Sequence, residues 1–287
     1  MQKKTSQIKI SSSQVDAVKL RFDKYFRFNN SPYWKAYYLP KIKTKDIARE
    51  QLYSKIIRNF CGEQAKVVDI GSGYGFLAKE LVTVNLDVTC VDLFPEMLEE
   101  AKKRLKGLPA TFINTDILDL PFKKNSLDCI IMESVIEHFA HREVTEDIIP
   151  YLYQFIKPGG YLFIHVPVRS PHSIIARIIR KYFLNDLPKW AIDDDGDVTH
   201  KMWLSYREYI TLFEKHGFTH INYDFRLTRS NARPKLLYVW MKEIQKILSN
   251  SNEDLSIDVA QQPYITTVKK MIKSKLALTS YILFKKG

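Results

Sequence analysis

A glycine-rich turn early in the chain lies between a short apolar run and a helical pattern. The apolar run at residues 67–70 is rich in β-branched side chains and predicts a buried parallel strand. The turn occupies residues 71–75, and apolar residues then recur at helical spacing over 76–81. Glycines let the backbone approach a ligand closely, and a helix N-terminus offers unpaired N–H groups. This order of elements predicts a site for a nucleotide-like ligand.

The spacing of the glycines narrows the class of ligand. Gly71, Gly73 and Gly75 follow one another at intervals of two, whereas a dinucleotide fingerprint needs Gly-x-Gly-x-x-Gly. Phe76 stands where that fingerprint requires its third glycine. Asp69, two residues before the turn, would repel a phosphate and attract a cationic amino group. We therefore expect a ligand without phosphates.

Apolar strands alternate with helical patterns along the centre of the chain. This alternation is typical of an α/β fold with a doubly wound parallel sheet. Two further strands are expected near the C-terminus, which makes the sheet seven-stranded and mostly parallel. The expected strands are 67–70, 86–91, 110–113, 127–132, 161–166, 219–225 and 279–285.

Acidic residues follow the first four of these strands in order. Ligands of such sheets bind at the carboxyl ends of the strands. Asp92 ends the second strand about 20 residues after the glycines, a position suited to hydrogen bonding both hydroxyls of a ribose. Asp116 follows the third strand and Glu133 ends the fourth. Together with Asp69, they predict one polar site along one edge of the sheet.

Three stretches of this sequence resemble motifs of class I S-adenosylmethionine-dependent methyltransferases. Residues 68–75 (Val-Asp-Ile-Gly-Ser-Gly-Tyr-Gly) resemble the first motif of that superfamily. Residues 135–138 (Val-Ile-Glu-His) and 157–160 (Lys-Pro-Gly-Gly) resemble two later features. The likeness covers roughly residues 66–224 and resumes at the C-terminus. It implies a Rossmann-like methyltransferase fold with an antiparallel last strand, S-adenosylmethionine as cofactor, and methyl transfer as the activity.

The resemblance also implies roles for individual residues. Asp116 would face the adenine amine, with Ile117 beside the ring. Glu133 would contact the methionine part through its side chain or its backbone carbonyl. Asp69 would bind the amino group through water or hold the glycine turn. The expected cofactor-binding residues are Asp69, Gly71, Ser72, Gly73, Gly75, Asp92, Leu93, Asp116, Ile117 and Glu133.

Two histidines are candidates for the base that deprotonates a methyl acceptor. His138 and His200 both fall in expected loops at strand ends, and the alternative for each is a structural histidine bonded to backbone. Ubiquinone-type methyltransferases hold a metal with a Glu-x-x-Glu-His pattern, but Ser134 replaces the first glutamate here. We therefore predict no required metal and expect Glu137 at the surface or behind the ligand contacts.

The flanking segments are expected to serve the acceptor. Residues 1–60 are expected to form an N-terminal helical extension that acts as a lid, and 61–287 the methyltransferase domain. Insertions are expected at about 170–200 and, as a helical insertion before the last strand, at 230–276. Residues 173–183 have the pattern of a basic amphipathic helix. Such a helix could contact an anionic membrane surface or pack over the sheet with its basic face in water.

The charge of the chain is unevenly distributed, and this distribution is compatible with several kinds of partner. Residues 1–60 hold 14 Lys and Arg against 4 Asp and Glu, whereas residues 61–168 hold 10 against 16. Basic flanks suit nucleic acid, an anionic membrane or an acidic substrate, and also plain solubility. The sequence has no apolar run near the ~18 residues of a membrane span and no signal-peptide pattern. The three cysteines lack Cys-x-x-Cys spacing and are expected to be free thiols, so we expect a cytoplasmic protein.

The predicted function is methyl transfer to a small-molecule acceptor, with a hydroxyl oxygen favoured. Glycans, quinone- or lipid-like molecules and secondary metabolites are the acceptor classes considered. An RNA or protein methyltransferase is the alternative, although no Asn-Pro-Pro-Tyr-like tetrapeptide follows the fourth strand. A non-catalytic binding subunit is a third possibility, which the intact motifs disfavour. The sequence does not assign an oligomeric state.

Overall fold

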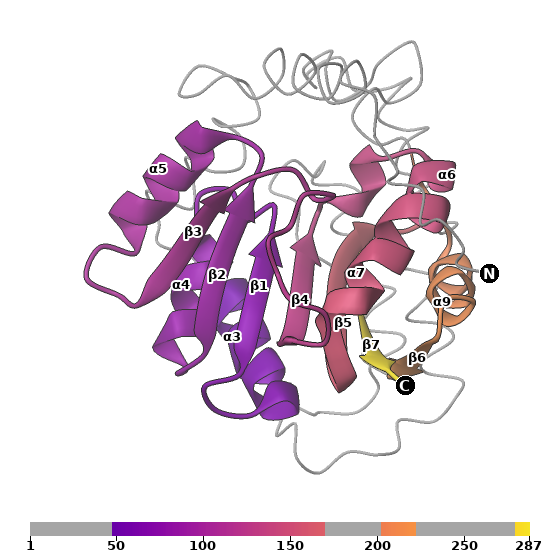
Figure 1. The fold of residues 1–287 in the computed structure, drawn as a ribbon, viewed down its shortest axis with the longest axis horizontal. Coiled ribbons are helices and arrows are strands. Elements are labelled where there is room, and N and C mark those ends of the chain that lie inside the picture. Colours follow the sequence, from indigo (N-terminus) through magenta and orange to yellow (C-terminus); the bar gives the residue numbers. More distant parts are fainter. Residues whose placement is uncertain (1–47, 170–201, 222–278) are drawn as a thin grey trace, which may run out of the picture.

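Seven strands form one twisted sheet in this computed structural model, which describes residues 48–169, 202–221 and 279–287 (Figure 1). The strand order is β3-β2-β1-β4-β5-β7-β6. Strands β1 to β5 pair in parallel, and β7 pairs antiparallel with both β5 and β6. The predicted α/β fold with a mostly parallel seven-stranded sheet is thus confirmed. The strands are β1 (Lys66–Ile70), β2 (Asp87–Asp92), β3 (Ala110–Asn114), β4 (Leu127–Glu133), β5 (Ile156–Pro167), β6 (Phe218–Ile221) and β7 (Thr279–Lys286).

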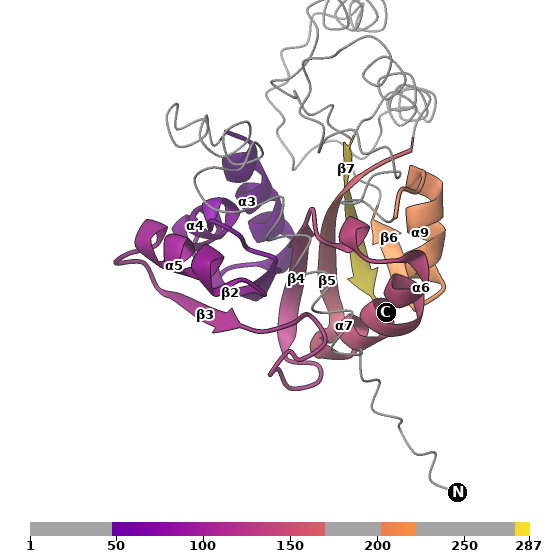
Figure 2. The same ribbon diagram turned by 90° about the horizontal axis from the view of Figure 1, so that it is seen from above.

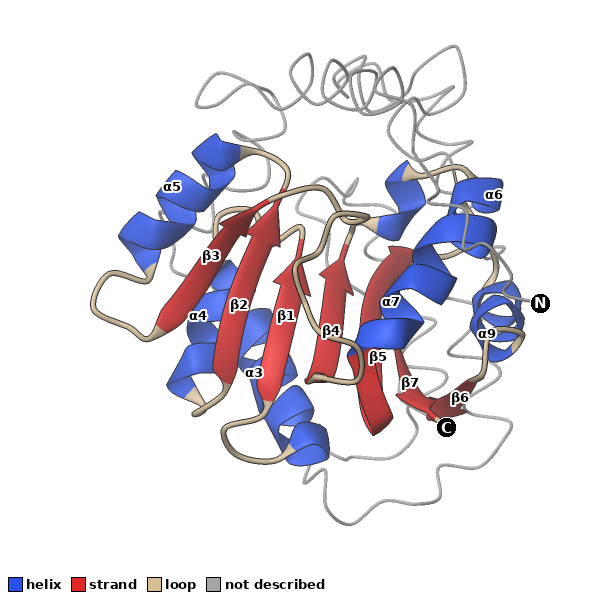
Figure 3. Ribbon diagram, viewed as in Figure 1, coloured by secondary structure: helices blue, strands red, loops and turns tan. Residues whose placement is uncertain are grey.

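Helices cover both faces of the sheet (Figures 2 and 3). One face carries α3 (Ala48–Cys61), α4 (Phe76–Thr83) and α5 (Pro95–Arg104). The other carries α7 (Ile149–Phe155) and α9 (Tyr206–Glu214). A short 3-10 turn, η2 (Ile136–His138), follows β4, and α6 (His141–Glu143) and the π-helical turn η3 (Val144–Ile148) lead into α7. Two large apolar clusters, one on each face, form most of the core, and a third small one consists of Tyr74, Phe76 and Met97.

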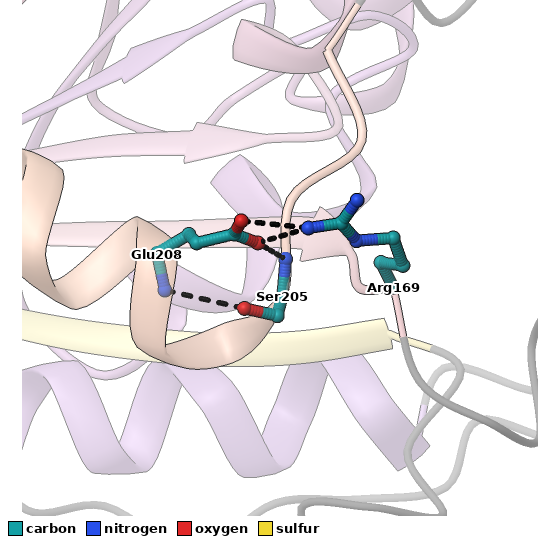
Figure 4. A network of polar contacts seen from close by, with 3 residues as sticks. All are labelled: Arg169, Ser205 and Glu208. Atoms are coloured by element: carbon teal, nitrogen blue, oxygen red, sulfur yellow. Dashed lines mark hydrogen bonds and ion pairs between the residues drawn. The ribbon is translucent and has the colours of Figure 1, made fainter.

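The helix ends follow from local sequence. Pro95 lies in the first turn of α5, where its missing N–H costs nothing. Ser205 caps α9 by accepting a hydrogen bond from the Glu208 N–H, and the Glu208 carboxylate accepts from the Ser205 N–H at 2.6 Å (Figure 4). These local signals place α5 and α9 where the sequence predicts them.

The Lys-Pro-Gly-Gly segment lies at the start of β5, which follows α7 without an intervening loop. The register between β4 and β5 shifts near their start. Leu127 pairs with Ile156 and Cys129 with Tyr161, so β5 advances five residues while β4 advances two. Gly159 adopts a φ of +76°, and a Cβ at Gly160 would lie 3.0 Å from the Asp128 carbonyl oxygen. The two glycines therefore let the chain turn sharply into the strand beside β4.

Helix α3 packs along a face of the sheet. Tyr53, Ile56 and Ile57 are fully buried in the same apolar cluster as β1 and α4. The helix expected before the first strand is thus confirmed from residue 48 on, as part of the core. Residues 1–47 of the predicted lid, the 173–183 segment and the 230–276 insertion lie outside the described residues, so the division at residue 60 stays a prediction.

Candidate active site

The glycine turn between β1 and α4 is held against the end of β2. The N–H groups of Gly71 and Ser72 both donate to the Val91 carbonyl oxygen, at 2.8 and 3.1 Å. Gly71 has a φ of +70°, and a Cβ there would lie 2.5 Å from a methyl carbon of Val135. Backbone conformation and crowding both require glycine at this position. The Ser72 hydroxyl faces the buried thiol of Cys90.

Helix α5 supports the same turn from behind. Gly75, with a φ of +70°, has no room for a Cβ, which would lie 2.8 Å from Leu105 Cδ1. The Arg104 guanidinium packs over the Phe76 ring, with its carbon 3.8 Å from the ring centroid. Arg104 Nε also donates to the Tyr74 carbonyl oxygen at 2.8 Å. Phe76, at the position of the missing third glycine, therefore fills the contact between α4 and α5.

Asp92, at the end of β2, closes the turn. Its Oδ2 accepts a hydrogen bond from the Gly73 N–H at 2.8 Å, and its Oδ1 accepts from the Phe94 N–H at 3.0 Å. The residue is only 6% exposed. Burial raises the pKa of its carboxyl from 3.8 to about 6, although the backbone donors oppose the change. Each carboxylate oxygen still has lone-pair capacity for a further donor.

Hydrogen bonds from Asn114, at the end of β3, connect that strand to the end of β2 beside Asp92. Asn114 Nδ2 donates to the carbonyl oxygens of Asp92 and Leu93, at 2.9 and 3.0 Å. Asp116 Oδ1 accepts a hydrogen bond from the Leu118 N–H at 2.9 Å, which fixes a tight local turn. Ile117 is buried next to it. The structure therefore brings these predicted residues to the same edge as the glycine turn.

Asp69 and Glu133 bring two carboxylates to the α3 side of the sheet. Asp69 is 2% exposed. Its pKa is raised well above the ordinary value, first by burial and then by the negative charges of Glu133 and Asp92. Glu133 Oε1 accepts a hydrogen bond from the Tyr281 hydroxyl at 3.2 Å. A buried carboxyl with acidic neighbours is a setting in which a cation binds favourably.

The candidate bases have different outcomes. His138 ends η2 beyond β4, half-buried, with its backbone N–H donating to the Val135 carbonyl at 3.1 Å. His200 lies outside the described residues. The roles of both as bases stay predictions. Within the three described ranges, no group of three His, Cys, Asp or Glu side chains could hold a metal ion, and the expectation of no required metal also stays a prediction.

Glu137 is not at the surface, one of the two positions that the sequence suggested, and its place behind the ligand contacts stays a prediction. Its side chain is 1% exposed. Its backbone contacts the segment that precedes α9, because the Met202 N–H donates to the Glu137 carbonyl at 3.1 Å. Its negative charge also raises the pKa of the Tyr209 hydroxyl, after burial, which is the larger cause. No sequence pattern reports this contact between η2 and the segment that precedes α9.

Sequence reasoning missed two polar residues of the site, His165 and Tyr281. His165 Nδ1 lies 3.9 Å from Glu133 Oε1, and the His165 and Tyr281 rings stack with centroids 4.1 Å apart. Tyr281 is 148 positions from Glu133, so only the insertion of β7 beside β5 joins them. The alternation of side chains along β5 places His165 on the same face of the sheet as Glu133. Sequence spacing does not show that β7 is the strand beside β5.

The fold and this edge define a Rossmann-like α/β protein with a glycine turn after β1 and an antiparallel β7. Residues 68–164 match the family model described as a methyltransferase domain. The matched segment runs from β1 into β5, so this part of the chain is similar to a methyltransferase domain.

Similar proteins include two ubiquinone biosynthesis O-methyltransferases. The protein from Photorhabdus laumondii is 24% identical over 155 residues, which cover 53% of this chain and 63% of that protein. The protein from Albidiferax ferrireducens is 24% identical over 190 residues, which cover 58% of this chain and 73% of that protein. The match thus spans less than two thirds of the first protein and about three quarters of the second.

A solved structure with the same fold is the magnesium protoporphyrin IX methyltransferase of Synechocystis PCC 6803, which contains bound SAH. The TM-score is 0.55 at 13% identity, and the match covers 96% of this chain and 95% of that one. This likeness shows the fold. In the described part of the chain, no helix combines the length and apolar character needed to cross a membrane.

Proposed function

We propose that this protein transfers a methyl group from S-adenosylmethionine to a hydroxyl oxygen of a small-molecule acceptor. The observation that carries the proposal is the glycine turn after β1, closed by the Asp92 carboxylate at the end of β2. The three glycines leave the backbone of the turn without side chains at their positions, which permits close approach of a ligand, and acidic residues follow along the same edge. The names of the two ubiquinone biosynthesis relatives support oxygen as the methylated atom.

The residues of the edge suit the proposed cofactor. Bound S-adenosylmethionine would supply an electrophilic methyl group on a sulfonium, so the protein must position it and exclude water. Asp92 would accept hydrogen bonds from the ribose hydroxyls with its remaining lone pairs. Asp116 and Ile117 would contact the adenine. Asp69 and Glu133 would face the positively charged methionine end, because their own charges oppose one another without it.

His138 is the candidate to accept the proton of the hydroxyl acceptor. It follows β4 on the edge where the parallel strands end. Replacing it with alanine should lower turnover about 100-fold or more, the ordinary size of a general-base contribution, and leave cofactor affinity unchanged. Release of S-adenosylhomocysteine with a panel of phenols and aliphatic alcohols measures this. Equal turnover by both proteins would assign His138 a structural role.

The cofactor site is tested by calorimetry with S-adenosylhomocysteine. The Asp92→Ala variant should bind at least about tenfold more weakly than the original protein, because one hydrogen bond to a charged group contributes about 1.5–3 kcal/mol. Asp87→Ala is the matched control, since Asp87 is an exposed acid at the opposite end of β2. Binding of equal strength by all three proteins would contradict the ribose assignment.

A further inference from the structure

Three polar side chains lie in a row across β4, β5 and β7 at the carboxyl end of β4. The register sets Glu133 opposite His165 and His165 opposite Tyr281. The Tyr281 hydroxyl donates to Glu133 Oε1 at 3.2 Å, and His165 Nδ1 lies 3.9 Å from the same oxygen. Two neighbouring strands thus contact one carboxylate oxygen and orient the carboxylate.

Packing around the row restricts its movement. The Tyr281 ring stacks on His165 on one side and on Tyr53 of α3, with centroids 4.1 and 3.6 Å apart. Ser134, the residue after Glu133, has a φ of +58°, and its N–H donates to the His165 carbonyl at 2.9 Å. A serine holds such a conformation only where its surroundings impose it. The backbone that carries Glu133 is therefore fixed as well as its side chain.

Glu133 is the more accessible of the two carboxylates on this side. Its side chain is 17% exposed, whereas Asp69 is 2% exposed. The negative charge of Glu133 contributes to the raised pKa of Asp69, after the larger effect of burial. A cation placed beside the pair would relieve this repulsion. The ammonium group at the amino-acid end of S-adenosylmethionine is a cation of suitable kind.

We propose that Tyr281, on the last strand, is a positioning residue that aims the Glu133 carboxylate at the ammonium group of the cofactor, with His165 as its support. The inference rests on the proposed function, because it concerns one end of the same ligand. It assigns the C-terminal strand a part in cofactor recognition. It also makes the site selective for ligands that carry the amino-acid end over those that carry adenosine and a thioether alone.

The test compares two ligands that share an adenosine thioether. S-Adenosylhomocysteine carries the amino-acid end, and 5′-methylthioadenosine lacks it. Tyr281→Phe removes the hydroxyl and keeps the ring that stacks on Tyr53 and His165. Calorimetry should show about tenfold weaker binding of S-adenosylhomocysteine, which equals about 1.4 kcal/mol, and unchanged binding of 5′-methylthioadenosine.

Two further variants sharpen the comparison. Glu133→Gln should show the same ligand selectivity, and adding Tyr281→Phe to it should cause no further loss, because the two residues act as a unit. Tyr206→Phe is the matched control. Its hydroxyl lies 2.8 Å from His220 Nε2, a contact between α9 and β6 at the far edge of the sheet. This control should bind both ligands as the original protein does.

The outcomes separate the inference from the proposed function. Equal weakening of both ligands by Tyr281→Phe would show a structural role only and overturn the inference. Unchanged binding of both ligands by that variant would also overturn it, while the proposed cofactor site would stand. If the original protein bound neither ligand, the proposed function would fail and the inference with it.

Discussion

Replacing Asp92 with asparagine should change how the stability of the protein depends on pH. The pKa of the Asp92 carboxyl is raised from 3.8 to about 6, chiefly by burial. Between these two values the folded protein binds more protons at this residue than the unfolded chain does. The free energy of unfolding therefore falls as the pH rises through the interval and stays lower above it.

The size of this effect follows from the two pKa values. At about 1.36 kcal/mol per pKa unit, the change from 3.8 to about 6 corresponds to ~3 kcal/mol. This is an upper figure, because the carboxylate can relax and admit water once it ionises. Asparagine has the same shape, carries no charge and keeps one oxygen acceptor. The variant should therefore lack most of the decrease, even if the lost hydrogen bond to one backbone N–H costs about 1–3 kcal/mol at every pH.

Urea denaturation at pH 4 and pH 7.5, followed by circular dichroism, measures the difference. The original protein should lose up to ~2.4 kcal/mol more than Asp92→Asn between the two pH values, because the unfolded carboxyl is already more than half ionised at pH 4. Taking the difference between proteins cancels the titration of groups that the substitution does not touch. Asp87→Asn, at the exposed start of β2, should follow the original protein. An equal loss for the original protein and Asp92→Asn would refute the reasoning.

Three further predictions concern the framework around the site. Gly71→Ala should lower the free energy of unfolding by about 2–4 kcal/mol, because it combines a left-handed φ with a clash at 2.5 Å. Gly107→Ala is the control, because Gly107 has a φ of +82° but nothing within 4 Å of a Cβ. It should cost about 1 kcal/mol, and thermal melts measure both variants. Lys286→Met should cost about 2–4 kcal/mol in urea denaturation, because it leaves one buried and one half-buried carbonyl oxygen without their donor. Arg169→Met should cost less than about 1 kcal/mol, with the difference shrinking in high salt, because its ion pair with Glu208 is half exposed (Figure 4). A loss above 2 kcal/mol for the Arg169 variant, or equal losses for the two glycine variants, would contradict these expectations.

Much of the fold could be predicted from the sequence because the relevant signals are local. The apolar run before Gly71, the proline that starts α5 and the Ser205 cap each act within a few residues. Parallel strands separated by helices then leave few possible sheets. The acidic residues at the strand ends fall on one edge for the same reason. Their order along the chain predicts that edge before any coordinate is known.

The details of the site depend on contacts between distant segments. The hydrogen bond from the Met202 N–H to the Glu137 carbonyl joins residues 65 positions apart. Phe76 could be recognised as a missing glycine, but its packing under Arg104 requires the position of α5. The turn that Asp92 closes also depends on an N–H group 19 residues away. No periodicity reports such pairs, because each is set by how helices pack on the sheet.

The sequence by itself determined the class of ligand site: a glycine turn without a phosphate-binding third glycine, followed by carboxylates at successive strand ends. Chain connectivity and the twist of parallel strands are sufficient to bring those residues to one edge. Only the tertiary structure decided which way the Glu133 carboxylate is held. That depends on β7 entering antiparallel between β5 and β6, which sets Tyr281 beside a residue 148 positions earlier. Pairing between strands so far apart is set by packing of the whole sheet, not by any local pattern.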